Sequence, residues 1–433
     1  MKERRHSVIK GKKILFITDS CPPNLTMSGI VVKNIIDYLI DENDIDIIAI
    51  QQGDDDCIRY KGIKVDYIKS YPYYILNNRK KKNNSNNIFL SLCYAVKVFF
   101  FRIISILSRF LSPIGLNKDI VKKIIKKAEN KMYSMKYDYV LCNAKPFESF
   151  DAIARLVEKY PSTRFIAYQT DDYVTAGDER YMPKSIIVKK HNNRMERINR
   201  YVEIFDTYGM LESVYKKEIG FINKQEKVIC MGIPLLFDKE NVKDANNIII
   251  KKNNKVSFVY AGSLVKSFRP PNECFEIMLE VIKKIDASID VYHRGDCDDI
   301  VNVYQNKSKG LICNRGTVSA DESYSAIDSA DVLISISNIA GDQISGKTFD
   351  YINTGKPIIH FYYDNNDMNA EVLERYSNGI SVCVSDISVS HDINRIVEFV
   401  HNNVGNIVLN DEILALYSEY TVEMVEKRLF EGE

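Results

Sequence analysis

The chain has 433 residues, which exceeds one ordinary hydrophobic core and fits two domains of about 200 residues each. Its 59 basic and 58 acidic residues give a formal net charge of +1, which argues against a general nucleic-acid-binding protein. The nine cysteines form no CxxC pair and the six histidines show no HExxH-like spacing, so we expect a reducing compartment and no bound zinc. Residues 1–6 are charged and a strand pattern follows them, so we expect a cytoplasmic protein without a signal peptide.

Short buried strands alternate with helical patterns along both halves of the chain. In the first half, strands are predicted at 13–18, 46–51, 63–68, 139–143, 164–169, 207–210 and 227–231, with a helix at 30–39 after the first strand. In the second half, they are predicted at 255–260, 289–293, 310–313, 331–336, 357–363 and 380–384. This alternation predicts an α/β protein with two doubly wound parallel sheets.

The polar run 238–247 is the best linker candidate, so we place the domains at 1–236 and 237–410 and a C-terminal segment at 411–433, in which one helix is predicted over 411–430. Ligands of such sheets bind at the carboxyl ends of the strands, so the active site is expected in the cleft between the domains.

One apolar segment of the first domain has two interpretations. The run 88–111 is long enough to cross a bilayer, but Lys97 and Arg102 near its middle would each cost roughly 2.5–3.5 kcal/mol to insert. It fits the membrane surface better, with the basic residues of 79–82 and 122–127 facing anionic lipid. The alternative is a buried helix whose basic side chains reach the solvent. The Asn- and Lys-rich run 77–87 next to it is expected to be a mobile loop.

The most informative stretch is 339–359, which lies between two predicted strands. Ser345, Gly346 and Lys347 form a turn before a helix predicted at 348–353, and a helix start with a nearby lysine is typical of an anion site. Asp350, one turn further, is placed to bind two hydroxyls of a sugar. Phosphate and sugar recognised together indicate a nucleotide-sugar pocket, with Asp342 as a second carboxylate.

At these residues the chain resembles the GT-B glycosyltransferases, most closely the retaining family 4 group. That group carries a Glu-x7-Glu motif, whose two acidic positions here are Asp342 and Asp350. In one branch of the group the helix opens with Ser-Lys-x-Phe-Glu-Tyr, which 345–351 resembles with one extra glycine and with Asp in place of Glu. The resemblance implies two Rossmann-like domains facing a central cleft, with the last helix packing back toward the first domain. It also implies that Asp350 binds the donor ribose and that Asp342 acts beside the donor sugar and the leaving phosphate.

The resemblance extends to the connection that follows the first strand of the second domain. Gly262 lets the backbone approach a ligand there. Family members place an arginine directly after this glycine and a lysine five or six positions later, and both hold the donor diphosphate. Here Ser263 stands at the first position and Arg269 best matches the second, while Lys266 is a candidate to replace the missing cation.

Further site residues are expected on other loops. Arg294 follows a predicted strand and is a candidate to contact base or phosphate, and Val318 closes a loop resembling the one whose backbone holds the base edge. Gly29 matches the family glycine that lets the first-domain loop reach the donor phosphates. Asp171 and Asp172 follow a strand where relatives place a residue that contacts the donor sugar or the acceptor, so they are catalytic candidates. The alternative is that this pair caps a helix.

The resemblance implies a retaining transferase that needs no metal and no cofactor. It would move a hexose from a UDP- or GDP-sugar to a glycan or lipid-linked acceptor in surface polysaccharide synthesis. Arg269, Lys347 and the helix dipole would stabilise the leaving diphosphate. Lipid-linked acceptors favour peripheral contact of 88–114 with the inner face of the membrane. A GT-B nucleotide-sugar epimerase and a non-catalytic carbohydrate-binding protein remain alternatives, whereas the absence of G-x-G-x-x-G after either first strand disfavours a dinucleotide enzyme.

Overall fold

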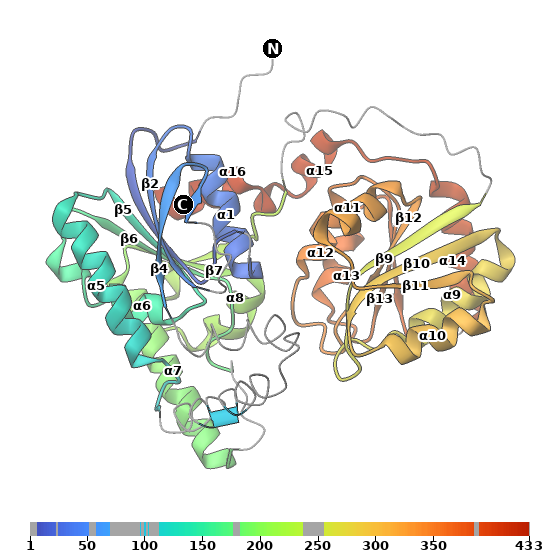
Figure 1. Ribbon diagram of the computed structural model, residues 1–433, viewed down its shortest axis with the longest axis horizontal. Helices are drawn as coiled ribbons and strands as arrows, with labels where there is room; N and C mark the ends of the chain where they lie inside the picture. Colours follow the sequence, from blue (N-terminus) through green and yellow to red (C-terminus); the bar gives the residue numbers. More distant parts are fainter. Residues whose placement is uncertain are drawn as a thin grey trace. The chain divides into compact units, whose positions relative to one another are not determined.

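The computed structural model describes residues 7–22, 25–51, 58–69, 96, 99–100, 103, 112–175, 182–236, 255–384 and 389–432. The predicted linker 238–247, the loop 77–87 and most of the segment 88–114 lie outside these residues. The chain forms two compact units, which Figure 1 shows as two sheets flanked by helices. The first unit comprises Met1–Pro234 and Glu419–Glu433, and the second comprises Leu235–Ser418.

The first unit is built on an eight-stranded sheet with the order β3-β4-β2-β1-β5-β6-β7-β8. Neighbouring strands run parallel, except that β3 is antiparallel to β4. Apart from the two-residue β3, every strand was predicted from the buried apolar runs. The strands are β1 (Lys13–Thr18), β2 (Asp44–Ile50), β3 (Arg59–Tyr60), β4 (Ile63–Ile68), β5 (Tyr139–Asn143), β6 (Arg164–Gln169), β7 (Thr207–Leu211) and β8 (Val228–Met231).

The order of this sheet defines where its winding reverses. The chain moves outward from β1 to β2 on one side and from β5 to β6 on the other, so β1 and β5 form the topological switch point. Right-handed connections place the helices of the two directions on opposite faces. The helices are α1 (Met27–Leu39), α5 (Lys118–Ser134), α6 (Glu148–Ile153), α7 (Lys184–Ile204) and α8 (Glu212–Glu218). In Figure 1, α5 lies beside α6, and α1 lies beside the last helix.

The last segment of the chain joins the first unit. Helix α16 (Val422–Glu431) packs on β6, β7 and β8, and the buried carboxylate of Glu426 accepts hydrogen bonds from the Ser7 hydroxyl and the Val8 amide. The prediction of one helix spanning 411–430 was wrong. The structure instead has α15 (Asn410–Leu416) in the second unit, followed by a break, because Thr421 caps a new helix by accepting a bond from the Met424 amide.

The second unit is built on a six-stranded parallel sheet with the order β11-β10-β9-β12-β13-β14. Its switch point lies between β9 and β12. The strands are β9 (Val256–Leu264), β10 (Ala287–Gly295), β11 (Ile312–Gly316), β12 (Val332–Ile336), β13 (Ile358–Tyr362) and β14 (Gly379–Cys383). The helices besides α15 are α9 (Asn272–Lys284), α10 (Asp298–Lys307), α11 (Ala320–Ser329), α12 (Gly346–Ile352), α13 (Met368–Glu374) and α14 (Val389–Asn403).

Two strands of this sheet extend further than their apolar runs predicted. β9 and β10 remain paired as far as Leu264 and Gly295. Gly295 has a φ of 135°, and a Cβ at this position would lie 1.9 Å from the carbonyl oxygen of Leu264, so only glycine lets the two strand ends approach this closely. Ser263 and Arg294 therefore lie on paired strands and not on loops as predicted.

No helix within the described part of the chain is long and apolar enough to cross a membrane.

Candidate functional site

Arg269 lies at the switch point of the second sheet, on the connection that follows β9. A tight turn holds it, because the Arg269 amide donates to the Val265 carbonyl at 2.7 Å. Its Nε donates to Oδ1 of Asn338, just beyond β12, at 3.0 Å, and its Nη1 donates to the carbonyl of Ser263 at 3.4 Å. The guanidinium thus bridges the two strands at the point where ligands of doubly wound sheets bind.

Two other predicted cations have different positions around Arg269. Arg294 on β10 donates from Nε to the Ser263 hydroxyl at 3.2 Å, so it joins Arg269 at the end of β9. Lys266 instead forms an exposed ion pair with Asp299 on α10 at 2.7 Å. Arg269 and Arg294 therefore converge on one residue, Ser263, whereas Lys266 is held by α10.

The predicted turn and carboxylate lie on the connection after β12. Lys347 and Asp350 lie on α12 and pair with each other at 3.2 Å. Burial raises the pKa of the Asp350 carboxyl, and the neighbouring Lys347 partly offsets this effect. The Lys347 ammonium also lies over the ring of Tyr324, 5.0 Å from its centroid. Tyr324 is 50% exposed on α11, so its ring forms an aromatic surface beside the Asp350 carboxylate. Sequence analysis did not identify Tyr324.

The amides of the turn before α12 are largely committed within the protein. The Ser345 amide donates to Oδ1 of Asn369 at 2.7 Å, and the Lys347 amide lies 3.3 Å from the Ser345 hydroxyl, which caps the helix. The predicted anion site at Ser345 and Gly346 would therefore depend more on the Lys347 side chain than on these amides. Helix α12 begins at Gly346, two residues before the predicted start.

A buried polar network holds this connection in place. The Asn369 side-chain amide, 2% exposed, donates to the Ser337 hydroxyl and to the Gln343 carbonyl. The Ser337 hydroxyl bonds the Asp367 carboxylate, whose other oxygen lies 3.1 Å from Nε2 of the buried His360. Burial by itself would raise the pKa of Asp367, but the bonds and charge of His360 and the Ser337 hydroxyl lower it below its usual value. The network fixes both ends of the loop that carries Asp342.

The remaining predicted residues of the second unit lie around this edge. Asp342 is exposed on the loop between β12 and α12. Val318 is half-buried on the loop between β11 and α11, where the neighbouring Thr317 hydroxyl bonds the His293 carbonyl. At Gly262, a Cβ would lie 2.9 Å from the Tyr260 hydroxyl. The close approach that this glycine permits is therefore to a side chain of the same strand and not to a ligand.

The first unit has a second polar cluster at its switch point. Thr26 caps α1 and bonds both carboxylate oxygens of Asp19, at 2.9 and 2.8 Å. Burial raises the Asp19 pKa to about 6, although hydrogen bonds from Thr26 and Ser20 oppose the shift. Gly29 is required because a Cβ would lie 2.0 Å from the Ser20 hydroxyl oxygen. This glycine therefore lets the loop after β1 fold onto the start of α1.

The loops after β5 and β6 meet the start of α1. The Asn143 side chain donates to the Ser28 hydroxyl at 2.6 Å, and the Thr170 hydroxyl donates to the Ala144 carbonyl at 3.1 Å. Beyond them, Asp171 forms an ion pair with Lys145 at 2.6 Å. Sequence analysis did not identify Lys145, although a cation two positions after a predicted strand, in Asn143-Ala-Lys145-Pro, is a signal that could have found it.

Asp172, the second predicted carboxylate, closes a turn by accepting from the Thr175 amide at 2.9 Å. Burial would raise its pKa, but the bonds from Thr175 lower it. Glu218 of α8 lies near Asp172 and is 1% exposed. Its carboxyl group accepts hydrogen bonds from the Gln169 side chain at 2.9 Å and from the Tyr173 amide at 3.3 Å. Burial, with the nearby Asp172 charge, raises the Glu218 pKa to about 8. No sequence pattern distinguished Glu218 from a surface residue of α8.

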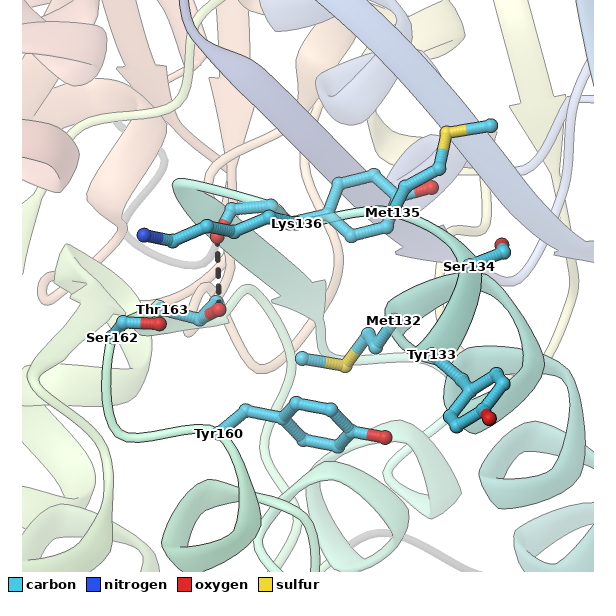
Figure 2. Close-up of a pocket in the computed structure, with 9 residues that line it drawn as sticks. Met132, Tyr133, Ser134, Met135, Lys136, Tyr160, Ser162 and Thr163 are labelled. Carbon is cyan, nitrogen blue, oxygen red and sulfur yellow. Dashed lines mark hydrogen bonds between the residues drawn. The ribbon is translucent and has the colours of Figure 1, made fainter.

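Two cavities in the described part of the chain lie away from both switch points. The first cavity, of about 220 Å³, lies at the amino edge of the first sheet. It is lined by the end of α5 and by the residues that precede β5 and β6. Figure 2 shows Met132 and Tyr160 along it, with Thr163 bonding the Tyr137 carbonyl at 2.8 Å. A larger one of about 590 Å³ lies over α6 and α7, around the Asp151 carboxylate. Among the described residues, no group of three or more His, Cys, Asp or Glu could hold a metal ion.

Comparison with known proteins shows the fold. No protein-family model matches the chain, and no curated protein matches it. Among solved structures, the lipopolysaccharide outer core galactosyltransferase WaaB in its apo form matches with a TM-score of 0.54 and 11% identity, over 97% of this chain and 98% of that one. HepE of Anabaena in complex with UDP and glucose matches with a TM-score of 0.54 and 11% identity, over 97% and 99%. The UDP-GlcNAc 2-epimerase of Methanocaldococcus jannaschii matches with a TM-score of 0.51 and 13% identity, over 97% and 98%. The chain therefore has the GT-B fold of two Rossmann-like domains, as predicted.

Proposed function

We propose that this GT-B protein is a retaining glycosyltransferase of the family 4 type, which moves a hexose from a UDP- or GDP-sugar to a glycan or lipid-linked acceptor without a metal ion. The observation that carries the proposal is that a fixed cation and a carboxylate lie at the two ends of the connection from β12 to α12, the cation being held there from the neighbouring connection after β9. Arg269 is bonded to Asn338 at the start of this connection, and Lys347 and Asp350 lie at its end. A nucleotide sugar carries a diphosphate and a ribose, which need such a pair of groups.

Each group has a defined part in the proposed reaction. Arg269 and Lys347 neutralise the charge that develops on the diphosphate as the bond to the sugar breaks. Asp350 accepts hydrogen bonds from the ribose hydroxyls, and Asp342 lies beside the sugar ring. The acceptor oxygen then bonds to the anomeric carbon on the face that the diphosphate leaves, and the hydroxyl proton passes to an oxygen of the leaving diphosphate. We assign Asp171 and Asp172 of the first unit to the acceptor side.

Nucleotide binding is the first test of the proposal. UDP, GDP, ADP and their sugar conjugates would be compared by thermal shift, without metal, on the wild type and on Asp350→Asn. One nucleotide should raise the Tm of the wild type, and the variant should lose most of this shift because its amide accepts fewer bonds than a carboxylate. Asp328→Asn, an exposed position on α11, is the matched control and should keep the shift. If no nucleotide shifts the wild type, the donor site is wrong.

Turnover separates the transferase from its alternatives. The epimerase alternative is supported by the match to a UDP-GlcNAc 2-epimerase, whose fold is the same. The protein would be incubated with the stabilising donor and acceptor extracts, and NMR of the products would distinguish three outcomes. Nucleoside diphosphate together with a glycosylated product supports transfer, and a changed sugar still attached to the nucleotide supports epimerisation. Binding without any change supports a carbohydrate-binding protein.

The proposal includes peripheral contact with a membrane through 88–114. In the described part of this segment, the adjacent side chains of Phe99 and Phe100 are 61% and 58% exposed, so two large apolar rings lie together at the surface. The protein should therefore co-sediment with vesicles that contain anionic lipid, and Phe99→Ser/Phe100→Ser should reduce the bound fraction severalfold. Tyr133→Ser, which removes an aromatic ring that is 91% exposed elsewhere on the first unit, is the control. Equal binding of all three proteins would remove this segment from the proposal.

A further inference from the structure

Two guanidinium groups converge on Ser263 at the carboxyl edge of the second sheet. Arg294 donates from Nε to the Ser263 hydroxyl at 3.2 Å, and Arg269 donates from Nη1 to the Ser263 carbonyl at 3.4 Å. The parallel register of β9 and β10 pairs Ser263 directly with Arg294. The Tyr260 hydroxyl also donates to the Ser263 carbonyl, at 2.9 Å, so a third side chain fixes the position of this serine.

The charge of these two groups is not balanced within the part of the protein that the structure describes. Neither Arg269 nor Arg294 has a carboxylate within salt-bridge distance among those residues. Two like charges brought to one residue repel each other, and an anion bound between them would relieve the repulsion. Three nearby cations of the unit do have carboxylate partners: Lys266 pairs with Asp299, Arg315 with Asp290, and Lys347 with Asp350.

We propose that Arg294 is a second ligand of the diphosphate, so that Arg269 and Arg294 clamp its two phosphate groups over Ser263. This inference rests on the proposed function and adds the residue that distinguishes nucleoside diphosphates from monophosphates. The Ser263 hydroxyl occupies one nitrogen of Arg294 and orients the group, which leaves the two terminal nitrogens for phosphate oxygens. Because Ser263 is small, the guanidinium of the adjacent strand occupies the space over it.

The test moves the charge from one strand to the other. Arg294→Ser removes it, and Ser263→Arg/Arg294→Ser restores it one strand away. Isothermal titration would measure the affinity for the nucleoside diphosphate that stabilises the wild type and for its monophosphate. The single variant should bind the diphosphate 10- to 100-fold more weakly and the monophosphate less than threefold more weakly. The double variant should recover to within about fivefold of the wild type. Arg315→Ser, which removes a paired arginine of β11, should change neither affinity.

Three results would overturn the proposal. They are an unchanged diphosphate affinity in Arg294→Ser, an equal loss for diphosphate and monophosphate, and a double variant that binds no better than the single one. Circular dichroism would confirm that each variant is folded. If the wild type binds no nucleotide, the proposed function fails, and inorganic pyrophosphate then tests the clamp separately. Binding of pyrophosphate that Arg294→Ser weakens at least tenfold supports the clamp, and its absence overturns it.

Discussion

Arg269→Gln should weaken the binding of the nucleoside diphosphate by roughly 100-fold, which corresponds to about 2.7 kcal/mol. The expected loss is large because the guanidinium is already positioned. Its bonds to Asn338 and Ser263 fix it at the switch point, so binding an anion requires little reorganisation. Glutamine keeps a donor and most of the length of the side chain but removes the charge and the forked geometry. Affinities by isothermal titration would give the ratio.

Two comparisons separate an electrostatic role of Arg269 from a structural one. The turn that carries it is also held by backbone bonds between Val265 and Arg269 and between Ile339 and Phe268, so the variant should keep its ligand-free Tm. Arg269→Lys retains the charge without the fork and should lose about tenfold. The affinity for the uncharged nucleoside should not change in either variant. An equal loss for nucleoside and nucleoside diphosphate would show that the substitution had disturbed the site as a whole.

The parallel sheets were predictable because their signal is local. Strands buried on both faces are continuous apolar runs, and thirteen of the described strands coincide with such runs to within a few residues. The strand ends were less predictable. β9 continues through Gly262 and Ser263 because β10 pairs with it, and that pairing depends on the glycine at 295. A partner strand more than twenty residues away therefore determines where β9 ends.

The residues of the candidate site show the same difference between local signals and contacts that depend on distant elements. Arg269, Lys347 and Asp350 could be proposed as site residues because each lies in a short motif on the connection that follows a predicted strand. The contacts between elements could not be identified in this way. The bond from Arg294 to Ser263 depends on the register of β9 and β10. The ion pair that holds Lys266 away from this site depends on Asp299 of α10. Likewise, the Ser345 amide bonds Asn369, which follows it in the chain only after a complete helix and strand.

Glu218→Gln should make the protein more stable than the wild type at alkaline pH and slightly less stable at pH 5. The folded protein keeps a proton on Glu218 up to its pKa of about 8, whereas the unfolded chain releases it near the ordinary value of 4.5. The wild type therefore loses stability as the pH rises through this interval, by on the order of 4 kcal/mol between pH 5 and 9. Glutamine has no proton to release, so the variant does not incur this loss.

The buried contacts of Glu218 explain the small cost expected at low pH. Both of its oxygens accept bonds, from Gln169 and from the Tyr173 amide, and a glutamine at this position can accept only one of them. The lost bond should cost about 1 kcal/mol. The two stability curves should therefore cross between pH 5 and 7, with the variant higher at pH 9. Asp19, whose pKa is also raised, is present in both proteins, so its contribution cancels in the difference.

The measurement of Glu218→Gln is the difference in Tm between variant and wild type at half-unit steps from pH 5 to 9. This difference should rise by roughly 10 °C across the range, most steeply below pH 8. Glu212→Gln is the matched control on the same helix, because its carboxylate is partly exposed and pairs with Lys216 at 3.1 Å. The comparison of the two differences shows how much of the pH dependence is specific to Glu218. A flat difference for Glu218→Gln would mean that Glu218 releases its proton at the same pH in the folded and the unfolded protein, and it would contradict the prediction.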